Sequence, residues 1–381
     1  MADDIYSILI KKQLTFPANG VKMTIMKKRI SAVTAMALAV IMLMSSLSGC
    51  SLQGKKKEDI VTIGEDSASL KVGMVTDSSG IDDRSFNQSA WEGLKFLNAN
   101  MGAKVGYIEA ASTGEYKADL ELLAKNGYGL CWGVGYTFAD AIVKAAKNNP
   151  DTCFAIIDYE CEEIPSNLTC ATFRVEEAAF LAGYIAGSVT QSGKVGFIGG
   201  MDVEAMHPFQ FGYLAGVAYS DNEKGKKTEP RVHYLDGFED SEKGAKAAKK
   251  MYDEGCDVIF HAAGGAGIGV IETAAAENKY VIGVDCDQSY LAPDNVLTSV
   301  IKKVDVVISN ISVQYEIDDN IDGASLNYGL SEYALDIPED HRNYSDEVYE
   351  RVLSLKDQII YNEIEIPKDK KGYDEFVASL S

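Results

Sequence analysis

Several short apolar segments of this chain end in aspartate, whose carboxylate can bind a polar ligand. Asp77, Asp158 and Asp285 follow such segments, and three other segments end in Gly135-Tyr136, Gly237-Phe238 and Gly264-Gly265. In open α/β sheets, ligands bind beyond the carboxyl ends of the strands. The pattern therefore predicts a ligand-binding site assembled from the ends of several strands.

The common motifs of catalysis and metal binding are missing from the sequence. It contains no G-x-S-x-G, Walker A, H-E-x-x-H or C-x-x-C motif, and its four histidines are scattered. Gly265 and Gly267 follow an apolar segment, but a dinucleotide-binding G-x-G-x-x-G would need Gly or Ala at Val270. We therefore expect a binding protein without catalytic residues, cofactor or metal.

Alternating strands and helices must position the residues at the strand ends. Apolar runs predict strands at 70–77, 103–110, 129–135, 152–158, 168–173, 193–200, 231–237, 256–264, 280–287 and 295–301. Helical spacing predicts helices at 85–100, 116–127, 139–150, 176–190, 208–220, 242–255, 269–279, 302–317 and within 345–367, the last with a short strand. Such alternation is typical of α/β proteins whose parallel sheets carry helices on both faces.

The alternation restarts near Gly193, which predicts two similar lobes with the binding site in a cleft between them. The expected organisation is an upstream extension and signal peptide at 1–49, a flexible tether at 50–68, a first lobe at 69–190 with part of 302–335, and a second lobe at 191–301 with part of 336–381.

The segment before Cys50 has the features of an export signal. Basic residues at 27–29 precede an apolar run at 30–44 that is too short to span about 30 Å of hydrocarbon comfortably. Leu47-Ser48-Gly49-Cys50 then resembles the lipobox of bacterial lipoproteins, in which the cysteine is diacylated and becomes the N-terminus. We expect lipidation at Cys50 and a location on the extracytoplasmic face of the cell membrane; the alternative is an uncleaved membrane anchor.

The chain is strongly acidic, with a formal net charge of −21. The segment before Cys50 carries a net charge of +4, so its removal leaves about −25. Such a charge argues against nucleic acid and anionic lipid as partners, and disfavours multiply charged ligands unless a basic pocket exists. Cys131, Cys153, Cys170 and Cys256 lie in or beside apolar runs, which favours buried free thiols, although the even number of cysteines after Cys50 also allows disulfides.

The segment VTDSSGIDDRSFNQSAWEGL at 75–94 closely resembles the signature of the basic-membrane-protein family of purine-nucleoside-binding lipoproteins, the substrate-binding components of ABC transporters. Other segments follow in the family's order, among them EEAAFLAGYIAG at 176–187, GKVGFIGGMDV at 193–203 and VIGVDCDQ at 281–288. The chain departs from the family pattern at 204–207 and after Tyr328. The resemblance implies a two-lobed type I periplasmic-binding-protein fold.

The resemblance also implies residues that contact a purine base. In the family the base lies between two aromatic rings, and the matching positions are Phe86 and Phe238. Asp77 and Asn87 match residues that contact the edge of the base. Without the resemblance, the two phenylalanines would be read as packing residues and Asp77 as a helix cap.

Further positions match the family's ribose contacts: Asp158, Asp285 and Lys302. A carboxylate can accept both hydrogens of two neighbouring hydroxyls, and the lysine would donate to a ribose oxygen. Lys303 is the alternative to Lys302 in this register. Gly135, Tyr136 and Gly264 would let the backbone approach the ligand closely.

The resulting hypothesis is a lipid-anchored monomer that captures guanosine, adenosine or inosine and delivers it to an ABC permease. Two alternatives keep the same architecture: binding of a sugar or another small solute, and a signalling co-receptor that binds ligand without driving transport.

Overall fold

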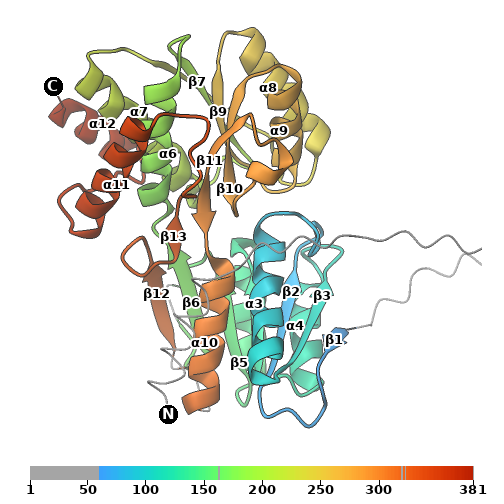
Figure 1. The fold of residues 1–381 in the computed structure, drawn as a ribbon. Coiled ribbons are helices and arrows are strands. Elements are labelled where there is room, and N and C mark those ends of the chain that lie inside the picture. Colours follow the sequence, from blue (N-terminus) through green and yellow to red (C-terminus); the bar gives the residue numbers. More distant parts are fainter. Residues whose placement is uncertain (1–59, 162–163, 319–320, 322, 381) are drawn as a thin grey trace, which may run out of the picture. The chain divides into compact units, whose positions relative to one another are not determined.

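The computed structural model describes residues 60–161, 164–318, 321 and 323–380, and within them two mainly parallel sheets are flanked by helices (Figure 1). This arrangement confirms the predicted α/β fold class. The first sheet has the strand order β1-β3-β2-β4-β5-β6-β12, and the second has the order β13-β11-β10-β9-β7-β8. The antiparallel pairs are β1 with β3 and β11 with β13.

The strands of the first sheet are β1 (Val61–Ile63), β2 (Lys71–Thr76), β3 (Lys104–Glu109), β4 (Leu130–Val134), β5 (Cys153–Ile157), β6 (Leu168–Phe173) and β12 (Ala324–Tyr328). Helices α3 (Phe86–Met101) and α10 (Val304–Asp318) contact each other on one face, and α4 (Tyr116–Lys125) and α5 (Ala139–Asn148) cover the other. Both faces of the central strands are buried, which explains why β4 and β5 are continuous apolar runs.

The strands of the second sheet are β7 (Lys194–Gly199), β8 (Glu229–Tyr234), β9 (Val258–Ala262), β10 (Tyr280–Asp285), β11 (Val296–Lys302) and β13 (Leu335–Asp336). Helices α8 (Ser241–Asp253) and α9 (Ala266–Ala276) pack together on one face, and α6 (Val175–Val189) and α7 (His207–Lys224) on the other. Helices α11 (Asp346–Ile360) and α12 (Lys370–Ser379) contact α6 and α7 respectively (Figure 1).

The chain passes between the two sheets three times. It leaves the first sheet after β6 to enter α6, returns after β11 to enter α10, and leaves again after β12 to reach β13 (Figure 1). Each crossing follows the carboxyl end of a strand, so the crossings and the loops that could bind ligand lie at the same edges of the sheets.

The short strand expected within 345–367 is wrong, because the described residues there form α11 and a loop. Three further details differ from the organisation expected from sequence. Residues 61–63, expected in the tether, form β1 at the edge of the first sheet. Helix α6, expected in the first lobe, contacts α7, α11 and strands β9, β11 and β13 of the second. Lys302, expected at the start of a helix, is the last residue of β11. The expected signal, the lipidation site Cys50 and most of the tether lie outside the described residues.

Candidate functional site

A cavity of about 290 Å³ lies among the loops at the carboxyl ends of strands from both sheets. All ten residues expected at the site line it: Asp77, Phe86, Asn87, Gly135, Tyr136, Asp158, Phe238, Gly264, Asp285 and Lys302. The volume is close to the lower end of the range for small-molecule sites. The fold therefore brings residues that are up to 225 positions apart in sequence to the wall of one cavity.

Two of the cavity aspartates occupy equivalent positions in the two sheets. Asp158 directly follows β5 and Asp285 is the last residue of β10. Both have a positive φ, 64° and 66° respectively, in a region that residues other than glycine rarely adopt. Backbone conformations of this kind are concentrated at binding sites, where the surrounding structure holds them. Here they turn the chain as it leaves β5 and again as it leaves β10.

Lys302 is the cation that faces these carboxylates. Its side chain is 3% exposed, and Nζ pairs with Oδ2 of Asp158, which is 26% exposed. Nζ also lies 4.7 Å from the ring centroid of Phe86 and 4.8 Å from that of Phe173. A buried ammonium group needs such partners because its desolvation is costly. Lys303 is directed elsewhere, with its Nζ 3.1 Å from Asp336 Oδ2, so of these two neighbouring lysines it is Lys302 that lines the cavity.

Asp285 is the most deeply buried of the three predicted aspartates. Its carboxylate accepts a hydrogen bond from Ser85 Oγ, which belongs to a loop of the first sheet. Burial raises the pKa of Asp285 to about 6, while Lys302 and the Ser85 hydrogen bond act in the opposite direction. The carboxyl group is therefore ionised at neutral pH and becomes protonated in mildly acidic solution.

The two predicted aromatic residues each pack against a glycine. A Cβ atom added to Gly200 would lie 2.1 Å from Cε1 of Phe238, so only glycine allows the ring to sit there. A Cβ atom on Gly135 would lie 3.5 Å from Cε1 of Phe86, and the positive φ of Gly135, 112°, also favours glycine. These contacts hold one ring from each sheet at the cavity wall.

The start of α3 is fixed by a buried carboxylate. Asp83 accepts hydrogen bonds from the backbone N–H groups of Ser85, Asn87 and Gln88, at 2.8 to 3.0 Å, and so satisfies donors of the first turn. Asn87 Nδ2 donates to Asp77 Oδ1 at 2.8 Å, whereas its Oδ1 is buried and has no hydrogen-bond partner among the residues that the structure describes. An acceptor left unpaired in a cavity wall is suited to an N–H group of a ligand.

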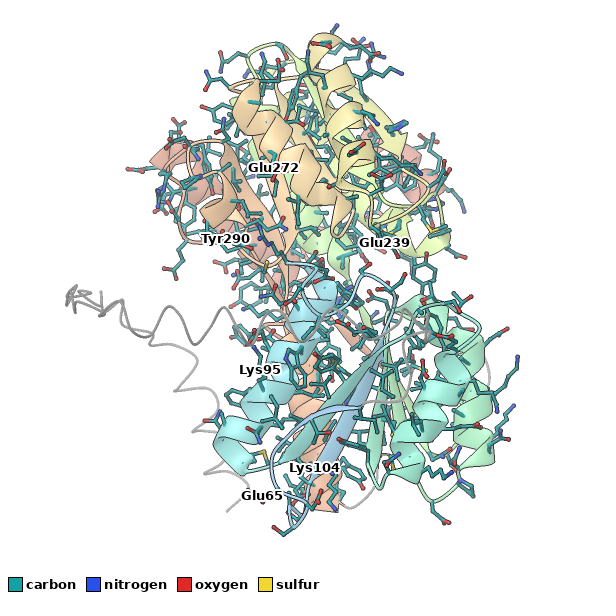
Figure 2. The ribbon with its side chains drawn as sticks, turned by 90° about the vertical axis from the view of Figure 1, so that its right-hand side faces the viewer. Glu65, Lys95, Lys104, Glu239, Glu272 and Tyr290 are labelled. Carbon is teal, nitrogen blue, oxygen red and sulfur yellow. The ribbon has the colours of Figure 1, made fainter. Side chains whose placement is uncertain are left out.

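Hydrogen bonds join the loops of the two sheets around the cavity. Besides the Ser85–Asp285 contact, Ser78 Oγ donates to Glu239 Oε1 at 2.6 Å, and Tyr136 O–H donates to Met201 Sδ at 3.6 Å. Glu239 lies where the loops of the second sheet approach those of the first (Figure 2). These contacts would have to break for the two sheets to separate and open the cavity.

The cavity also contains residues that the sequence did not indicate. Phe173, Arg174 and Glu176 come from the crossing between β6 and α6, Met206 directly precedes α7, and Phe209 lies in the first turn of α7. Ala205 and Met206 belong to the segment that departs from the family pattern, so that departure alters the cavity wall. An acidic residue in a first helical turn is an ordinary helix feature, so nothing in the sequence distinguishes Glu176 as a cavity residue.

Glu176 is only 9% exposed, and burial raises its pKa to about 7, while Lys368 and Arg174 oppose the shift. Lys368 reaches the cavity from the segment between α11 and α12. The C-terminal segment thus contributes to the site, although nothing in its sequence marks it as a binding segment.

The part of the chain that the structure describes contains neither a metal centre nor a membrane-spanning helix. No group of His, Cys, Asp or Glu side chains in this part of the chain is arranged to hold a metal ion. In the same residues, no helix combines the length and apolar character needed to cross a bilayer.

Comparisons with known proteins relate this chain to solute-binding proteins. Residues 70–370 match the Bmp family, described as ABC transporter substrate-binding protein PnrA-like. Basic membrane protein A1 of Borrelia garinii subsp. bavariensis is 39% identical over 312 residues, which cover 81% of this chain and 91% of that protein. The ABC transporter nucleoside-binding protein BmpA of Lactococcus lactis subsp. cremoris is 36% identical over 365 residues, covering 90% and 99% respectively.

A solved structure supports the same relationship. The crystal structure of an ABC transporter solute-binding protein from Aeropyrum pernix K1 superposes with a TM-score of 0.73 at 26% identity, and the match covers 82% of this chain and 97% of that one.

Proposed function

Because this chain belongs to the Bmp family of ABC transporter substrate-binding proteins, we propose that it captures a purine nucleoside in the cavity between its two sheets. Guanosine, adenosine and inosine are the candidate ligands. The relative from Lactococcus lactis is named as a nucleoside-binding protein, which supports this class of ligand. The family consists of solute-binding proteins, so the expected event is binding and release without a chemical step.

The observation that carries the proposal is that the two sheets each supply an aromatic ring to one cavity whose wall also holds carboxylates. Phe86 comes from the first sheet's α3 and Phe238 from the loop after β8. The purine base of a nucleoside is flat and binds well by stacking, whereas the hydroxyl groups of its ribose need hydrogen-bond acceptors. Asp158 and Asp285 supply such acceptors, and Lys302 supplies a donor beside them.

The base edge has candidate partners as well. Asp77 and the unpaired Oδ1 of Asn87 present acceptors to the cavity. Guanine and hypoxanthine carry an N–H group on the six-membered ring, and adenine carries an exocyclic amino group, so each base has a hydrogen to donate. An acceptor-rich edge therefore favours purines that present donors.

The charge of the cavity wall favours an uncharged ligand. Its acidic lining residues are Asp77, Asp83, Asp158, Glu160, Glu176 and Asp285, and its basic ones are Arg174, Lys302 and Lys368. Because acids outnumber bases and Lys302 already pairs with Asp158, a 5′-phosphate would meet net repulsion. A nucleoside therefore fits this lining better than a nucleotide.

We also propose that the chain works as a monomer on the extracytoplasmic face of the cell membrane, held by lipid on Cys50, and delivers its ligand to an ABC permease. The signal-like sequence before Cys50 supports the anchor. Two acyl chains provide a stable tether, since each buried methylene contributes about 0.8 kcal/mol. Membership of an ABC transporter family supports the permease as partner.

Mass spectrometry of the small molecules released on denaturing the purified protein tests the ligand class. We expect a purine nucleoside, and its amount should fall in the Phe238→Ala variant. Phe96→Ala is a matched control, because Phe96 lies on α3 outside the cavity lining. Release of a free sugar would support the alternative solute, and conversion of added nucleoside to free base would indicate an enzyme. If no nucleoside is released and none binds on addition, the proposal is wrong.

A further inference from the structure

Two buried cysteines meet beside the cavity. Cys161 Sγ and Cys170 Sγ lie 2.7 Å apart, and both residues are buried. Cys170 is in the middle of β6, and Cys161 is in the segment that follows β5. The other neighbouring pair does not meet in this way, because Cys131 and Cys153 are on adjacent strands but face opposite sides of the first sheet.

We propose that Cys161 and Cys170 form a disulfide that fastens the segment after β5 to β6. That segment begins at Asp158, and both Asp158 and Glu160 line the cavity. The bond would therefore limit the movement of a chain segment that carries one of the proposed ribose-binding residues. It is a modification site distinct from the cavity itself, and its formation does not depend on which ligand the cavity binds.

The reaction is a thiol–disulfide exchange with a low-molecular-weight disulfide such as oxidised glutathione. The thiolate of one cysteine attacks a sulfur of that disulfide and releases one thiol, and the second cysteine then attacks the mixed disulfide and releases the other. The two protein sulfurs lose two electrons and two protons in total, and one oxidised glutathione becomes two reduced molecules.

The bond should form while the chain folds. Burial raises the pKa of the Cys161 thiol to about 12, and it raises the pKa of the Cys170 thiol as well. Since the thiolate is the reacting form, both sulfurs react slowly once they are buried. The same burial would shield the completed bond from soluble reductants.

Thiol counting after refolding tests this inference. The full chain with Cys50→Ser keeps six cysteines. After complete reduction and denaturation, N-ethylmaleimide should label all six. After refolding with reduced and oxidised glutathione and then denaturing, it should label four, and peptide mapping should identify a Cys161–Cys170 cross-link that is two hydrogens lighter than the reduced pair.

Matched variants separate this pair from the other cysteines. When Cys131→Ser is added to Cys50→Ser, the number of cysteines that N-ethylmaleimide labels should fall from five in the reduced protein to three after refolding. When Cys161→Ser is added instead, the number should be five in both states. The parent refolded with reduced and oxidised glutathione should also unfold at a higher temperature than the parent refolded under fully reducing conditions, and Cys161→Ser should abolish that difference. The inference is wrong if N-ethylmaleimide labels all six cysteines in parent protein that has regained its fold, or if peptide mapping finds a cross-link between other cysteines.

Discussion

The ammonium group of Lys302 lies 4.7 Å from the ring centroid of Phe86, so a cation at the end of the second sheet faces an aromatic ring at the start of the first sheet's α3. The same ammonium pairs with Asp158 of the first sheet. Lys302 therefore connects the proposed stacking residue with a proposed ribose-binding residue, and it does so across the two sheets.

Replacing this lysine should reduce stability. Lys302→Met leaves the Asp158 carboxylate without its partner and should lower the free energy of unfolding by roughly 1–3 kcal/mol, less than the ~3–5 kcal/mol typical of a fully buried pair because Asp158 is a quarter exposed. Lys303→Met is the control and should cost less than about 1 kcal/mol, since its pair with Asp336 is more exposed. Denaturant unfolding measures both values, and equal losses would contradict a special role for Lys302.

Nucleoside binding should weaken in acid through Asp285. Its pKa is about 6 in the folded protein, so the carboxylate is ionised above this pH and can accept two hydroxyl hydrogens. As the pH falls through about 6, protonation removes an acceptor and the affinity should fall. In Asp285→Asn the affinity should be low throughout and should lose this pH dependence, and binding of free purine bases should change far less. Equal losses for base and nucleoside would make Asp285 structural.

The raised pKa of Asp285 should also make the stability of the protein depend on pH. Because the folded-state pKa lies above the unfolded value of about 4, the folded state binds more protons between pH 4 and 6. Asp285 therefore makes the protein less stable as the pH rises through this window. Asp285→Asn should remove that decline in the free energy of unfolding, which unfolding curves at several pH values would reveal. A decline of undiminished size in the variant would assign it to other groups.

The membrane anchor depends on one side chain. Cys50→Ala should abolish lipid attachment, because the thiol is the acceptor, and should shift the protein to the soluble fraction or leave an uncleaved precursor. Palmitate labelling of the parent and the variant measures this directly. Labelling that persists in the variant would show that the lipid is attached elsewhere.

Ligand should bring the two sheets together. The proposed contacts are divided between them, with Phe86 and Asp158 on the first and Phe238 and Asp285 on the second. A nucleoside can touch both sets only when the loops approach, so it should shift the population toward the closed form. X-ray scattering should show a smaller radius of gyration at saturating nucleoside. An unchanged profile would indicate that the cavity is closed without ligand or that one sheet alone binds it.

The strand ends of the site were predictable from sequence, whereas some of its walls were not. Asp158 and Asp285 directly follow short apolar runs, and such runs mark strands that are buried on both faces. Lys302 lies one residue beyond the strand predicted at 295–301; because residues 296–314 contain no glycine or proline, periodicity alone does not locate the boundary between β11 and α10.

Long-range packing decided the remaining differences. Helix α6 is nearly all apolar and could have covered either sheet, so its sequence did not show that it packs on the second. Helix α12 has no fully buried residue, and only its partly buried Tyr373 and Phe376 have rings that pack against the core, which is too short a pattern to predict a helix from sequence. Lys368 reaches the cavity only because α11 and α12 are docked on α6 and α7, a relationship that no local pattern encodes.

Calorimetric titration of guanosine, adenosine and inosine into the parent protein and its Phe86→Ala, Phe238→Ala and Phe96→Ala variants is the sharpest test of whether the chain binds a purine nucleoside between Phe86 and Phe238. At least one nucleoside should bind the parent without being consumed. Phe86→Ala and Phe238→Ala should each weaken that binding by about 1–3 kcal/mol, the range for loss of one stacked aromatic ring, and Phe96→Ala should leave it unchanged. Unchanged affinity in both cavity variants would contradict the account.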